Sequence, residues 1–457
     1  MTQSTNRRAF IKTGVATARI LAMPAIAQEK KNAIRMGFIG VGNRGTQLLH
    51  MFMDQPDVEV VALCDVYGPY MRRDDAAVSP RWRELLGDRI PNMGEKFSKP
   101  VTYYADYRDL LANKEIDAVC IATPDHWHAI QTIDAIQAGK DVYVEKPLTV
   151  TLAEGRRMVE AQKASKQVVA VGLNRRGSSV HHKLAALLHG GHLGELRVAR
   201  SWRVNNLSSA GIGRFKDEAP PVDFDWDRWI GPRSFRPYRY NIAPYFFRWH
   251  SAFSTQMGNW GVHYLDAIRW MMQETAPSAI YATGGRYWID HDADIPDTME
   301  VIFEFASKRL VTFTLHDNNG GQVLPMKDIQ ICGEKGTVYV DENSYEIVPS
   351  RPGQFQTWKP SVEPAKYTEP SPMLADGSRA GPAVGLIRNF LDCIKTRQTP
   401  FCSLEEGHRS TSFAHLANIA VKMKQRLEWD PVRERFTNCE KANELLSYDY
   451  RKPYTLG

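Results

Sequence analysis

A glycine-rich turn between a predicted strand and a predicted helix constrains the fold of this chain most. The turn is Gly40-Val41-Gly42-Asn43-Arg44-Gly45, and it follows the apolar run Arg35 to Ile39. It opens a helical stretch from Thr46 to Met53, and a second apolar run, Val58 to Cys64, then leads to Asp65. A strand, G-x-G-x-x-G, a helix, a strand and an acid in this order form a dinucleotide-binding fingerprint.

Each glycine has its own role in that fingerprint. Gly40 permits the tight turn, Gly42 lets the backbone approach a pyrophosphate, and Gly45 allows close packing of helix and strand. The helix N-terminus offers free N–H groups and a positive dipole end to the phosphates. A carboxylate at Asp65 accepts hydrogen bonds from ribose hydroxyls and repels a 2′-phosphate, which favours NAD over NADP. The alternative is an ordinary glycine turn.

Charge and hydropathy exclude two classes of partner. The 457 residues include 58 Lys and Arg against 52 Asp and Glu, a formal net charge of +6. Residues 1–27 hold Arg7, Arg8, Lys12 and Arg19 and no acid, so the remainder is close to neutral. No basic run suggests a nucleic-acid partner. No apolar stretch approaches the roughly 20 residues that span a bilayer.

The N-terminal segment resembles a twin-arginine export signal. Residues 6–12 are Asn-Arg-Arg-Ala-Phe-Ile-Lys, and Ala25-Ile26-Ala27 fits a small-residue cleavage site, although Arg19 interrupts the apolar region between them. The alternative is a basic segment with a chance Arg-Arg pair. We expect residues 1–33 to be a signal peptide and linker, and the protein to be periplasmic or extracellular. Because this route moves folded proteins, a tightly bound NAD can travel with the chain and be regenerated in place.

Alternating strands and helices predict an N-terminal Rossmann domain with a doubly wound parallel sheet over residues 34–172. Beyond the elements around the glycine turn, strands are predicted at residues 117–123, 141–145 and 167–171, and helices at 126–137 and 152–164. Cys64 and Cys120 end predicted buried strands and are expected to be free core thiols. The sequence leaves open whether two of Cys393, Cys402 and Cys439 form a disulfide.

The second half of the chain has a different pattern. Residues 205–256 are rich in Pro, Trp, Tyr and Arg without periodicity and are predicted as long loops. Strands at residues 196–202, 279–282, 299–305, 310–314, 328–332 and 338–340 predict a mostly antiparallel sheet. Residues 350–380 are predicted as an extended surface loop, followed by helices at 384–396 and 404–427. We assign residues 173–400 to a substrate and oligomerisation domain, and 401–457 to a C-terminal helix and tail.

The run Thr123-Pro124-Asp125-His126-Trp127-His128 ends the predicted strand 117–123. The carboxyl edge of a doubly wound sheet lines the ligand crevice, so this run is predicted to line a cofactor site. Its histidines invite a metal alternative, but residues i and i+2 of a helix do not face the same way. No third ligand is evident, so no metal site is predicted. A plain helix cap is the other alternative.

Two further motifs carry candidate catalytic groups. Glu145-Lys146-Pro147 ends the next strand at the same edge, where Lys146 can donate to a substrate hydroxyl and favour the alkoxide. Desolvation and a cationic neighbour would both lower its pKa. On a predicted helix running to Met272, Asn259, His263 and Asp266 share one face, and His263 can accept a hydroxyl proton. The alternatives are a surface lysine before a proline turn and a structural histidine.

Two other groups of polar residues are assigned structural places. His181 and His182 are predicted to lie on an exposed helix. The acids Asp223, Asp225 and Asp227 are predicted to form a turn and a helix cap, with sugar contact as the alternative.

Taken together, these motifs resemble the Gfo/Idh/MocA family of NAD(P)-dependent sugar and polyol oxidoreductases, in particular its exported bacterial branch. The resemblance runs from about Arg35 to the C-terminus. It includes the segments Gly172-Leu173-Asn174-Arg175-Arg176, Phe224-Asp225-Trp226-Asp227-Arg228-Trp229-Ile230-Gly231-Pro232 and Glu406-Gly407-His408-Arg409-Ser410. It implies a Rossmann domain followed by an α/β domain with an open, mostly antiparallel sheet that often builds a homo-oligomer, a dimer or tetramer. The helix near residues 404–427 is expected to pack back on the first domain.

The resemblance also implies roles for individual residues. Lys146 matches the catalytic lysine and His263 the acid/base histidine, with Arg175 and Asn259 beside the substrate. Many members have an aspartate at the position of Asn259, and an amide cannot share a proton relay. The motifs and the resemblance together predict these cofactor contacts: Gly40, Gly42, Asn43, Arg44, Gly45, Asp65, Thr123, Pro124, His126, Trp127, His128, Glu145, Lys146 and Asn174.

Three functions are compatible with these observations. The first is NAD-dependent hydride transfer at a hydroxyl carbon of a sugar or sugar derivative. The second is glycoside cleavage through a transient keto-sugar and elimination, without net redox change, as some exported relatives perform it. The third is a sensor of NAD or sugar on an enzyme fold, against which the retention of Lys146 and His263 argues.

Overall fold

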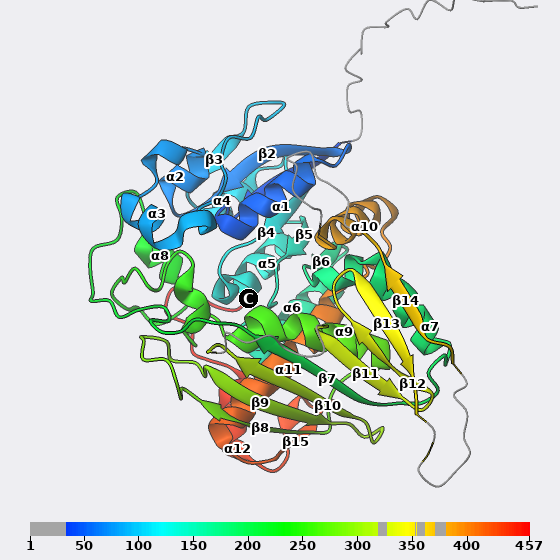
Figure 1. The fold of residues 1–457 in the computed structure, drawn as a ribbon. Helices are drawn as coiled ribbons and strands as arrows, with labels where there is room; N and C mark the ends of the chain where they lie inside the picture. Colours follow the sequence, from blue (N-terminus) through cyan, green and yellow to red (C-terminus); the bar gives the residue numbers. More distant parts are fainter. Residues whose placement is uncertain (1–32, 319–326, 352, 354–361, 371–380) are drawn as a thin grey trace, which may run out of the picture.

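The structure is a computed structural model that describes residues 33–318, 327–351, 353, 362–370 and 381–457 (Figure 1). The predicted signal at residues 1–33 therefore lies outside the described residues, apart from its last residue. So does much of the predicted loop at 350–380. No described helix is both long enough and apolar enough to cross a membrane.

The first sheet confirms the predicted doubly wound fold. Its six parallel strands follow the order β3-β2-β1-β4-β5-β6. They are β1 (Ile34–Ile39), β2 (Val58–Cys64), β3 (Thr102–Tyr104), β4 (Ala118–Ile121), β5 (Asp141–Val144) and β6 (Val169–Val171). β4, β5 and β6 are buried along their whole length, as expected for strands covered on both faces. The order reverses between β1 and β4, which places a ligand crevice at their carboxyl ends.

Helices cover both faces of this sheet (Figure 1). They are α1 (Asn43–Met53), α2 (Gly68–Arg72), α3 (Pro80–Leu86), α4 (Tyr107–Ala112), α5 (His128–Gln137) and α6 (Leu152–Lys163). α1 buries Leu48, Leu49 and Phe52, which lie on one side of a helix with 3.6 residues per turn. The ring of Phe52 meets that of Phe38 on β1 edge to face, with centroids 5.6 Å apart.

The second sheet is mixed and mostly antiparallel, also as predicted. Its described strands follow the order β14-β13-β12-β11-β7-β10-β9-β8-β15-β16, and β7 pairs with β10 in parallel. They are β7 (Leu196–Val204), β8 (Ala279–Gly285), β9 (Thr298–Glu304), β10 (Leu310–His316), β11 (Ile329–Gly333), β12 (Gly336–Val340), β13 (Ser344–Pro349), β14 (Ala365–Thr368), β15 (Leu427–Asp430) and β16 (Arg435–Phe436). Buried and more exposed residues alternate along β9, so one face of the sheet forms a core.

Helices cover the core face of the second sheet. They are α7 (Ser179–His189), α9 (Val262–Met272) and α11 (Leu404–Met423), joined by the short α12 (Glu440–Asn443). α11 contacts β8 on one side and α6 on the other, so it lies between the two sheets (Figure 1). The predicted helix 404–427 ends at Met423 instead, because Leu427 pairs with Ile280 as the start of β15.

Helix α10 (Ala383–Thr396) belongs to the core of the first domain, although the predicted boundary groups it with the second. Its Leu386, Ile387 and Phe390 are buried in the first core. The Phe390 ring lies 6.4 Å from that of Phe52 on α1. The tail also returns to the first domain, where the Tyr450 hydroxyl donates to Glu154 Oε1 at 2.6 Å.

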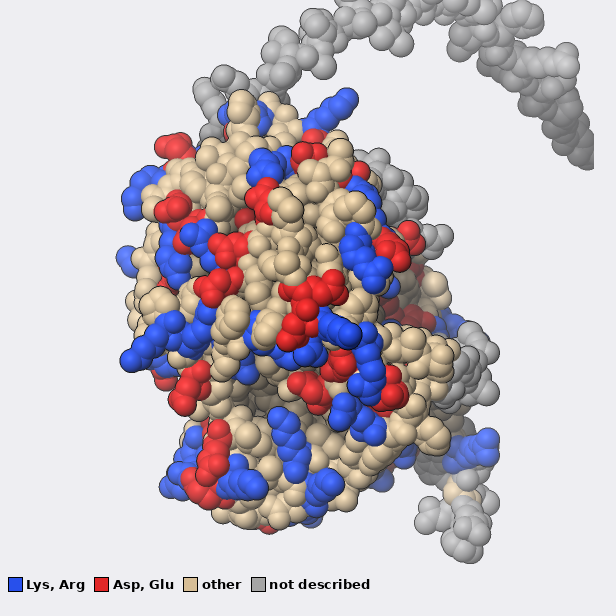
Figure 2. Space-filling model, turned by 90° about the vertical axis from the view of Figure 1, so that its left-hand side faces the viewer, with Lys and Arg blue, Asp and Glu red and all other residues tan. Residues whose placement is uncertain are grey.

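Residues 205–256 are mostly irregular, as predicted, but many of their aromatic rings are buried. The segment contains α8 (Trp226–Ile230) and the 3₁₀ turn η5 (Phe246–Trp249). Trp226 and Trp229 stack with centroids 4.9 Å apart and join the first core. Asp225 caps α8 by accepting from the Arg228 N–H at 2.9 Å, which confirms the predicted cap. Acidic and basic side chains are interspersed over the face shown in Figure 2.

The structure corrects the prediction for His181 and leaves no disulfide. His181 is fully buried, with Nε2 3.4 Å from Arg175 Nη1, because its side of α7 faces the second core. His182 is half-buried, and its ring lies 4.7 Å from that of Phe401. All six cysteines lie in the described part of the chain and are free thiols. The question of a bridge among the last three is thereby closed.

Candidate active site

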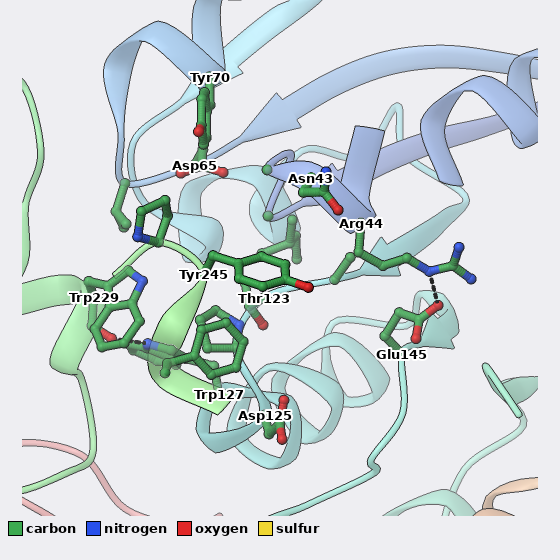
Figure 3. A pocket seen from close by; sticks show the side chains of 18 of the residues that line it. Asn43, Arg44, Asp65, Tyr70, Thr123, Asp125, Trp127, Glu145, Trp229 and Tyr245 are labelled. Carbon is green, nitrogen blue, oxygen red and sulfur yellow. Dashed lines mark hydrogen bonds and ion pairs between the residues drawn. The ribbon is translucent and has the colours of Figure 1, made fainter. Parts of the chain in front are cut away.

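A cavity of about 420 Å³ lies at the carboxyl edge of the first sheet. The turns after β1, β2, β4 and β5 form one wall, and residues from the second half of the chain form the other. Figure 3 shows side chains from both walls converging on this space. The predicted strand-end motifs therefore meet in one pocket.

The glycine turn has the geometry that a close approach of phosphate requires. Gly40 adopts φ +83°, and a Cβ there would lie 2.8 Å from the Thr123 nitrogen. A Cβ on Gly45 would lie 1.9 Å from the Gly40 oxygen, so only glycine lets α1 start this close to the strand. A Cβ on Gly42 would meet nothing nearer than the Tyr70 ring at 3.7 Å, so it would project into the pocket.

The N-terminus of α1 faces the pocket without a side-chain cap. Gly42 is the N-cap residue, and the first turn contains no acid. Asn43 and Arg44 both line the pocket. Free N–H groups at a helix N-terminus bind anions, so this end fits a pyrophosphate.

Asp65 lies at the end of β2 and connects the two turns. Its Oδ2 accepts from the Val41 N–H at 2.8 Å, and its Oδ1 accepts from the Tyr67 N–H at 3.0 Å. Burial raises the pKa of this carboxyl, which these backbone hydrogen bonds oppose. The carboxylate lines the pocket below Tyr70 (Figure 3). Its free lone pairs can accept ribose hydroxyls, as the fingerprint predicts.

Arg44 and Glu145 form an ion pair across the carboxyl edge. Arg44 Nε donates to Glu145 Oε1 at 2.7 Å, as the dashed line in Figure 3 marks. Arg44 Nη2 is buried and has no hydrogen-bond partner. An orphaned guanidinium nitrogen is costly, and an anionic ligand oxygen would satisfy it. Glu145 thus orients a cation at the predicted phosphate end.

The loop after β4 contributes only part of what was predicted. Thr123, Pro124, Asp125 and Trp127 line the pocket, but His126 and His128 do not. His126 Nε2 lies 3.0 Å from the Trp229 oxygen, and His128 Nδ1 lies 2.8 Å from the Pro147 oxygen. The two imidazoles are fully buried and hold neighbouring loops in place, so the prediction that they contact the cofactor is corrected.

Lys146, Asn259 and His263 come together in the pocket from both halves of the chain. Lys146 Nζ donates to the Asn259 backbone oxygen at 2.7 Å and to Asn259 Oδ1 at 3.2 Å. Asn259 lies in a π-helical turn, η6 (Met257–Gly261), directly before α9. The amide therefore fixes the ammonium group without pairing its charge.

Burial and neighbouring cations set the protonation of these groups. Burial lowers the pKa of Lys146 to about 8; Glu145 opposes the shift and Arg248 adds to it. Burial lowers the pKa of His263 well below its usual range, and Lys146 and Arg175 lower it further. At neutral pH His263 is thus a free base and Lys146 is mostly protonated. The lowered pKa of Lys146, caused by burial and by cationic neighbours, is as predicted.

The residues predicted around this centre divide into two groups. Asn174 and Arg175 line the pocket, and Arg175 Nη2 pairs with Asp328 Oδ2 at 2.5 Å. Asp266 does not line the pocket, although it was predicted to share a face with His263. Its Oδ1 accepts from Arg176 Nε at 2.9 Å and from the Ser410 hydroxyl at 2.6 Å in the core. The side chain of Asp266 thus lies on the side of α9 that packs against Arg176 and α11.

Sequence reasoning missed one wall of the pocket. Trp229, Tyr245, Phe247, Arg248 and Tyr454 all line it. The density of aromatic residues between 205 and 256 was visible in the sequence, but without periodicity it identified no individual residue. In the described parts of the chain, no group of three or more His, Cys, Asp or Glu residues could hold a metal ion.

Solved structures show the same fold at low sequence identity. A levoglucosan dehydrogenase in complex with NADH and levoglucosan superimposes with a TM-score of 0.62 at 17% identity, covering 87% of this chain and 99% of that one. The WlbA dehydrogenase from Bordetella pertussis, in complex with NADH and UDP-GlcNAcA, superimposes with a TM-score of 0.60 at 19% identity and the same coverage.

Curated relatives share a shorter segment. An alpha-N-acetylgalactosaminidase of Shewanella oneidensis is 34% identical over 134 residues, 29% of this chain and 26% of that protein. A glycosyl hydrolase family 109 protein of Shewanella baltica is 35% identical over the same share. The match thus spans about a quarter of the length of these relatives.

Family descriptions match three consecutive parts of the chain. "Oxidoreductase family, NAD-binding Rossmann fold" matches residues 34–173. "GFO/IDH/MocA C-terminal domain" matches residues 222–339, and "Oxidoreductase family, C-terminal alpha/beta domain" matches residues 380–456. Together they cover well over half of the sequence, in the order that the fold shows. The chain belongs to the Gfo/Idh/MocA family of oxidoreductases, whose N-terminal domain is an NAD-binding Rossmann fold.

Proposed function

We propose that this protein is an NAD-dependent oxidoreductase that transfers hydride between a hydroxyl carbon of a sugar, or sugar derivative, and a tightly bound nicotinamide cofactor. One observation carries the proposal. Lys146 comes from the domain of the first sheet and His263 from the domain of the second. Both line the same pocket as the uncapped glycine turn. Burial lowers the pKa of Lys146 to about 8, which makes its ammonium group a stronger hydrogen-bond donor to a substrate oxygen.

The residues present fit the cofactor. Gly42, the α1 N-terminus and the orphaned nitrogen of Arg44 would hold the pyrophosphate, and Asp65 would hold the ribose hydroxyls. When bound, NAD supplies a hydride acceptor, and its reduced form supplies a hydride donor. Asp65 favours NAD over its 2′-phosphorylated form, because a second negative charge would lie against a buried carboxylate.

The side chains of the chain account for the proton. His263 accepts the hydroxyl proton on a ring nitrogen, because burial and nearby cations keep the imidazole neutral. Lys146 donates a hydrogen bond to the same substrate oxygen and stabilises its developing negative charge. Asn259 holds the Lys146 ammonium from two oxygens. A carboxylate in place of this amide would pair with the ammonium and raise the pKa of Lys146, so the amide keeps that pKa low.

The decisive experiment starts from the purified protein with its own nucleotide. Heat or acid releases the bound cofactor, which is identified by its mass. The loaded protein is then mixed with a panel of sugars while absorbance at the NADH band is recorded. Reduction by at least one sugar, lost in Lys146→Ala, is the expected result. Absence of nicotinamide from the preparation, together with failure to bind added NAD, would contradict the proposal.

A second candidate is glycoside cleavage through a transient keto-sugar, with NAD reduced and reoxidised in each turnover. The curated relatives named as family 109 glycosidases, 34% identical over 134 residues, favour it. Product analysis separates the two. A cleaved aryl glycoside without accumulated NADH identifies the glycosidase, whereas a stable keto-sugar or lactone identifies net oxidation.

We also propose export by the twin-arginine route, supported by Arg7-Arg8 and by Ala25-Ile26-Ala27. An exported protein has no free NAD pool, which is why tight binding is part of the proposal. Changing both arginines to lysine should leave the protein in the cytoplasmic fraction and leave its leader uncleaved. Export of the variant at the wild-type level would contradict this route.

A homo-oligomer, a dimer or tetramer, is the last part of the proposal. The face of the second sheet opposite α9 and α11 carries Tyr281, a large apolar residue that is 39% exposed in the single chain. Light scattering on the purified protein measures the mass directly. Tyr281→Glu should lower the mass to that of one chain if this face forms the contact.

A further inference from the structure

An arginine in the pocket lacks a carboxylate partner. Arg248, in η5, lines the pocket. Its Nη1 donates to the Tyr245 backbone oxygen at 2.8 Å. No described residue forms an ion pair with its guanidinium, whereas Arg44 and Arg175 in the same pocket each have a carboxylate. Arg248 is half-buried, and a partly desolvated cation without a counter-ion favours binding of an anion.

Aromatic rings fix the guanidinium in place. Its central carbon lies 4.4 Å from the centroid of the Tyr245 ring and 4.4 Å from that of Phe247. The Tyr245 ring extends into the middle of the pocket (Figure 3). Stacking on two rings leaves the planar edge of Arg248 available with little loss of side-chain freedom on binding a ligand.

The nearby carboxylates already have other partners. Glu145 is paired with Arg44. Asp125 accepts a hydrogen bond from the Ser254 hydroxyl and is not within ion-pair distance of Arg248. Lys146, whose pKa Arg248 lowers, is held by the neutral Asn259. Lys146 and Arg248 thus carry two positive charges near the single carboxylate of Asp125, whose hydrogen-bond donor is a neutral hydroxyl, so this part of the pocket is net positive.

We propose that the substrate is an acidic sugar, such as a uronic or aldonic acid, whose carboxylate binds the planar edge of Arg248. Arginine binds carboxylates through two parallel N–H···O bonds, which fixes the orientation of the ligand as well as its charge. This inference rests on the proposed function, because it concerns the substrate of the same pocket. The same chemistry would suit a phosphate of the cofactor, but the uncapped α1 N-terminus and Arg44 already provide for that group on the opposite wall.

The test measures binding, so it does not depend on turnover. Protein loaded with NADH is titrated calorimetrically with D-glucuronate, D-gluconate and methyl β-D-glucoside, a neutral control of similar shape. We expect the wild type to bind an acid at least about tenfold more tightly than the glucoside. Arg248→Gln should remove that difference, and Arg248→Lys should keep part of it, because it retains charge without the fork. Arg433→Gln, a change of equal charge at an exposed site, should have no effect.

The Kd for NAD, measured on the same variants, shows whether Arg248 binds a phosphate of the cofactor or the carboxylate of the substrate. If Arg248→Gln weakens NAD binding and leaves acid binding unchanged, the arginine serves the cofactor and the proposal is overturned. Equal affinity of the wild type for acid and glucoside, or binding of neither acid, overturns it as well. Binding of acids through Arg248 without reduction of NAD by any sugar would sustain this inference and contradict the proposed function.

Discussion

The two walls of the pocket are built on different principles. The wall from the first sheet consists of short turns after consecutive parallel strands, positioned by backbone hydrogen bonds such as that from Val41 to Asp65. The facing wall comes from irregular segments, from η6 and the start of α9, and from the tail. It is positioned by ring packing, such as that of Trp229 on Phe253 with centroids 5.0 Å apart. The first wall can be recognised in the sequence by a motif. The second can be recognised only by its amino-acid composition.

This difference assigns different tasks to the walls. A turn fixed by the sheet suits a ligand that is the same in every turnover, such as a cofactor, because strand register leaves the turn few alternative conformations. Side chains on irregular backbone can change without disturbing the sheet, which suits a wall that distinguishes substrates. We therefore expect substitutions in the first wall to affect cofactor binding and chemistry, and those in the irregular part of the second wall to affect substrate choice. His263 on α9 is the exception in the second wall, because it supplies the proposed base.

The largest effect is expected at Lys146. Lys146→Ala removes the donor to the substrate oxygen, and kcat for hydride transfer should fall by about 10³- to 10⁴-fold. The Kd for NAD should change less than kcat does, because Gly42, the α1 N-terminus and Arg44 provide the proposed pyrophosphate contacts. Stopped-flow absorbance at the NADH band measures the first property and calorimetry the second. A variant that reduces its NAD at the wild-type rate would show that the first wall does not supply the chemistry.

The next effect concerns the ion-pair network behind the second wall. Asp266 is fully buried against Arg176 on η4 (Asn174–Gly177) and Ser410 on α11. Asp266→Ala leaves the Arg176 charge partly uncompensated, which should lower the free energy of unfolding by about 3–5 kcal/mol. Asp290→Ala, which removes an exposed ion pair with Arg214, is the control and should lose less than about 1 kcal/mol. Urea denaturation compares them, and equal losses would contradict the assignment.

A pair of glycine substitutions separates ligand space from packing in the first wall. Gly42→Ala adds a methyl group to the pocket at φ −71°, so stability should be kept while the Kd for NAD rises by roughly 100-fold. Gly45→Ala collides with the Gly40 oxygen and should cost about 1–3 kcal/mol of unfolding free energy. Thermal denaturation with and without NAD distinguishes them. Unchanged NAD affinity in Gly42→Ala would mean that the cofactor lies elsewhere.

The smallest effect concerns pH. Lys146 donates only while protonated, and burial lowers its pKa to about 8, so kcat/KM should fall as pH rises through 8. His263 acts as a base while neutral, and its lowered pKa keeps it neutral down to pH values below its usual range. The profile should therefore be flat between about pH 6.5 and 7.5. Activity that rises through pH 8 would make Lys146 the base and break the assignment of roles.

Local sequence signals predicted the first domain well. The glycine turn, Asp65 and Lys146 each follow an apolar strand. Because the carboxyl ends of parallel strands meet at one edge of the sheet, the topology alone predicted that these groups lie close together. The same argument wrongly placed His126 and His128 in the pocket lining. Adjacency in sequence does not show which side chains face the pocket and which hold the loop behind it.

The second wall could not be predicted in the same way. Arg248 and Tyr454 reach the pocket through contacts between distant parts of the chain, and no period in the sequence records such contacts. The predicted end of the helix 404–427 and the predicted place of Asp266 beside His263 were wrong for a related reason. Leu427 leaves the helix because it can pair with β8, and Asp266 lies in the core because it accepts hydrogen bonds from Arg176 and Ser410, which come from distant parts of the chain. Tertiary pairing overrode local propensity at both places.

The tail has a consequence for the order in which the protein is made. Gly40 and Tyr454 lie at opposite ends of the sequence, yet both line the same pocket, and the Tyr454 ring packs on Trp127 with centroids 5.3 Å apart. The first sheet can form early in synthesis, but its crevice still lacks one side until the tail has emerged and docked. The complete pocket therefore forms only after the segment around Tyr454 has been made and has docked on the first domain.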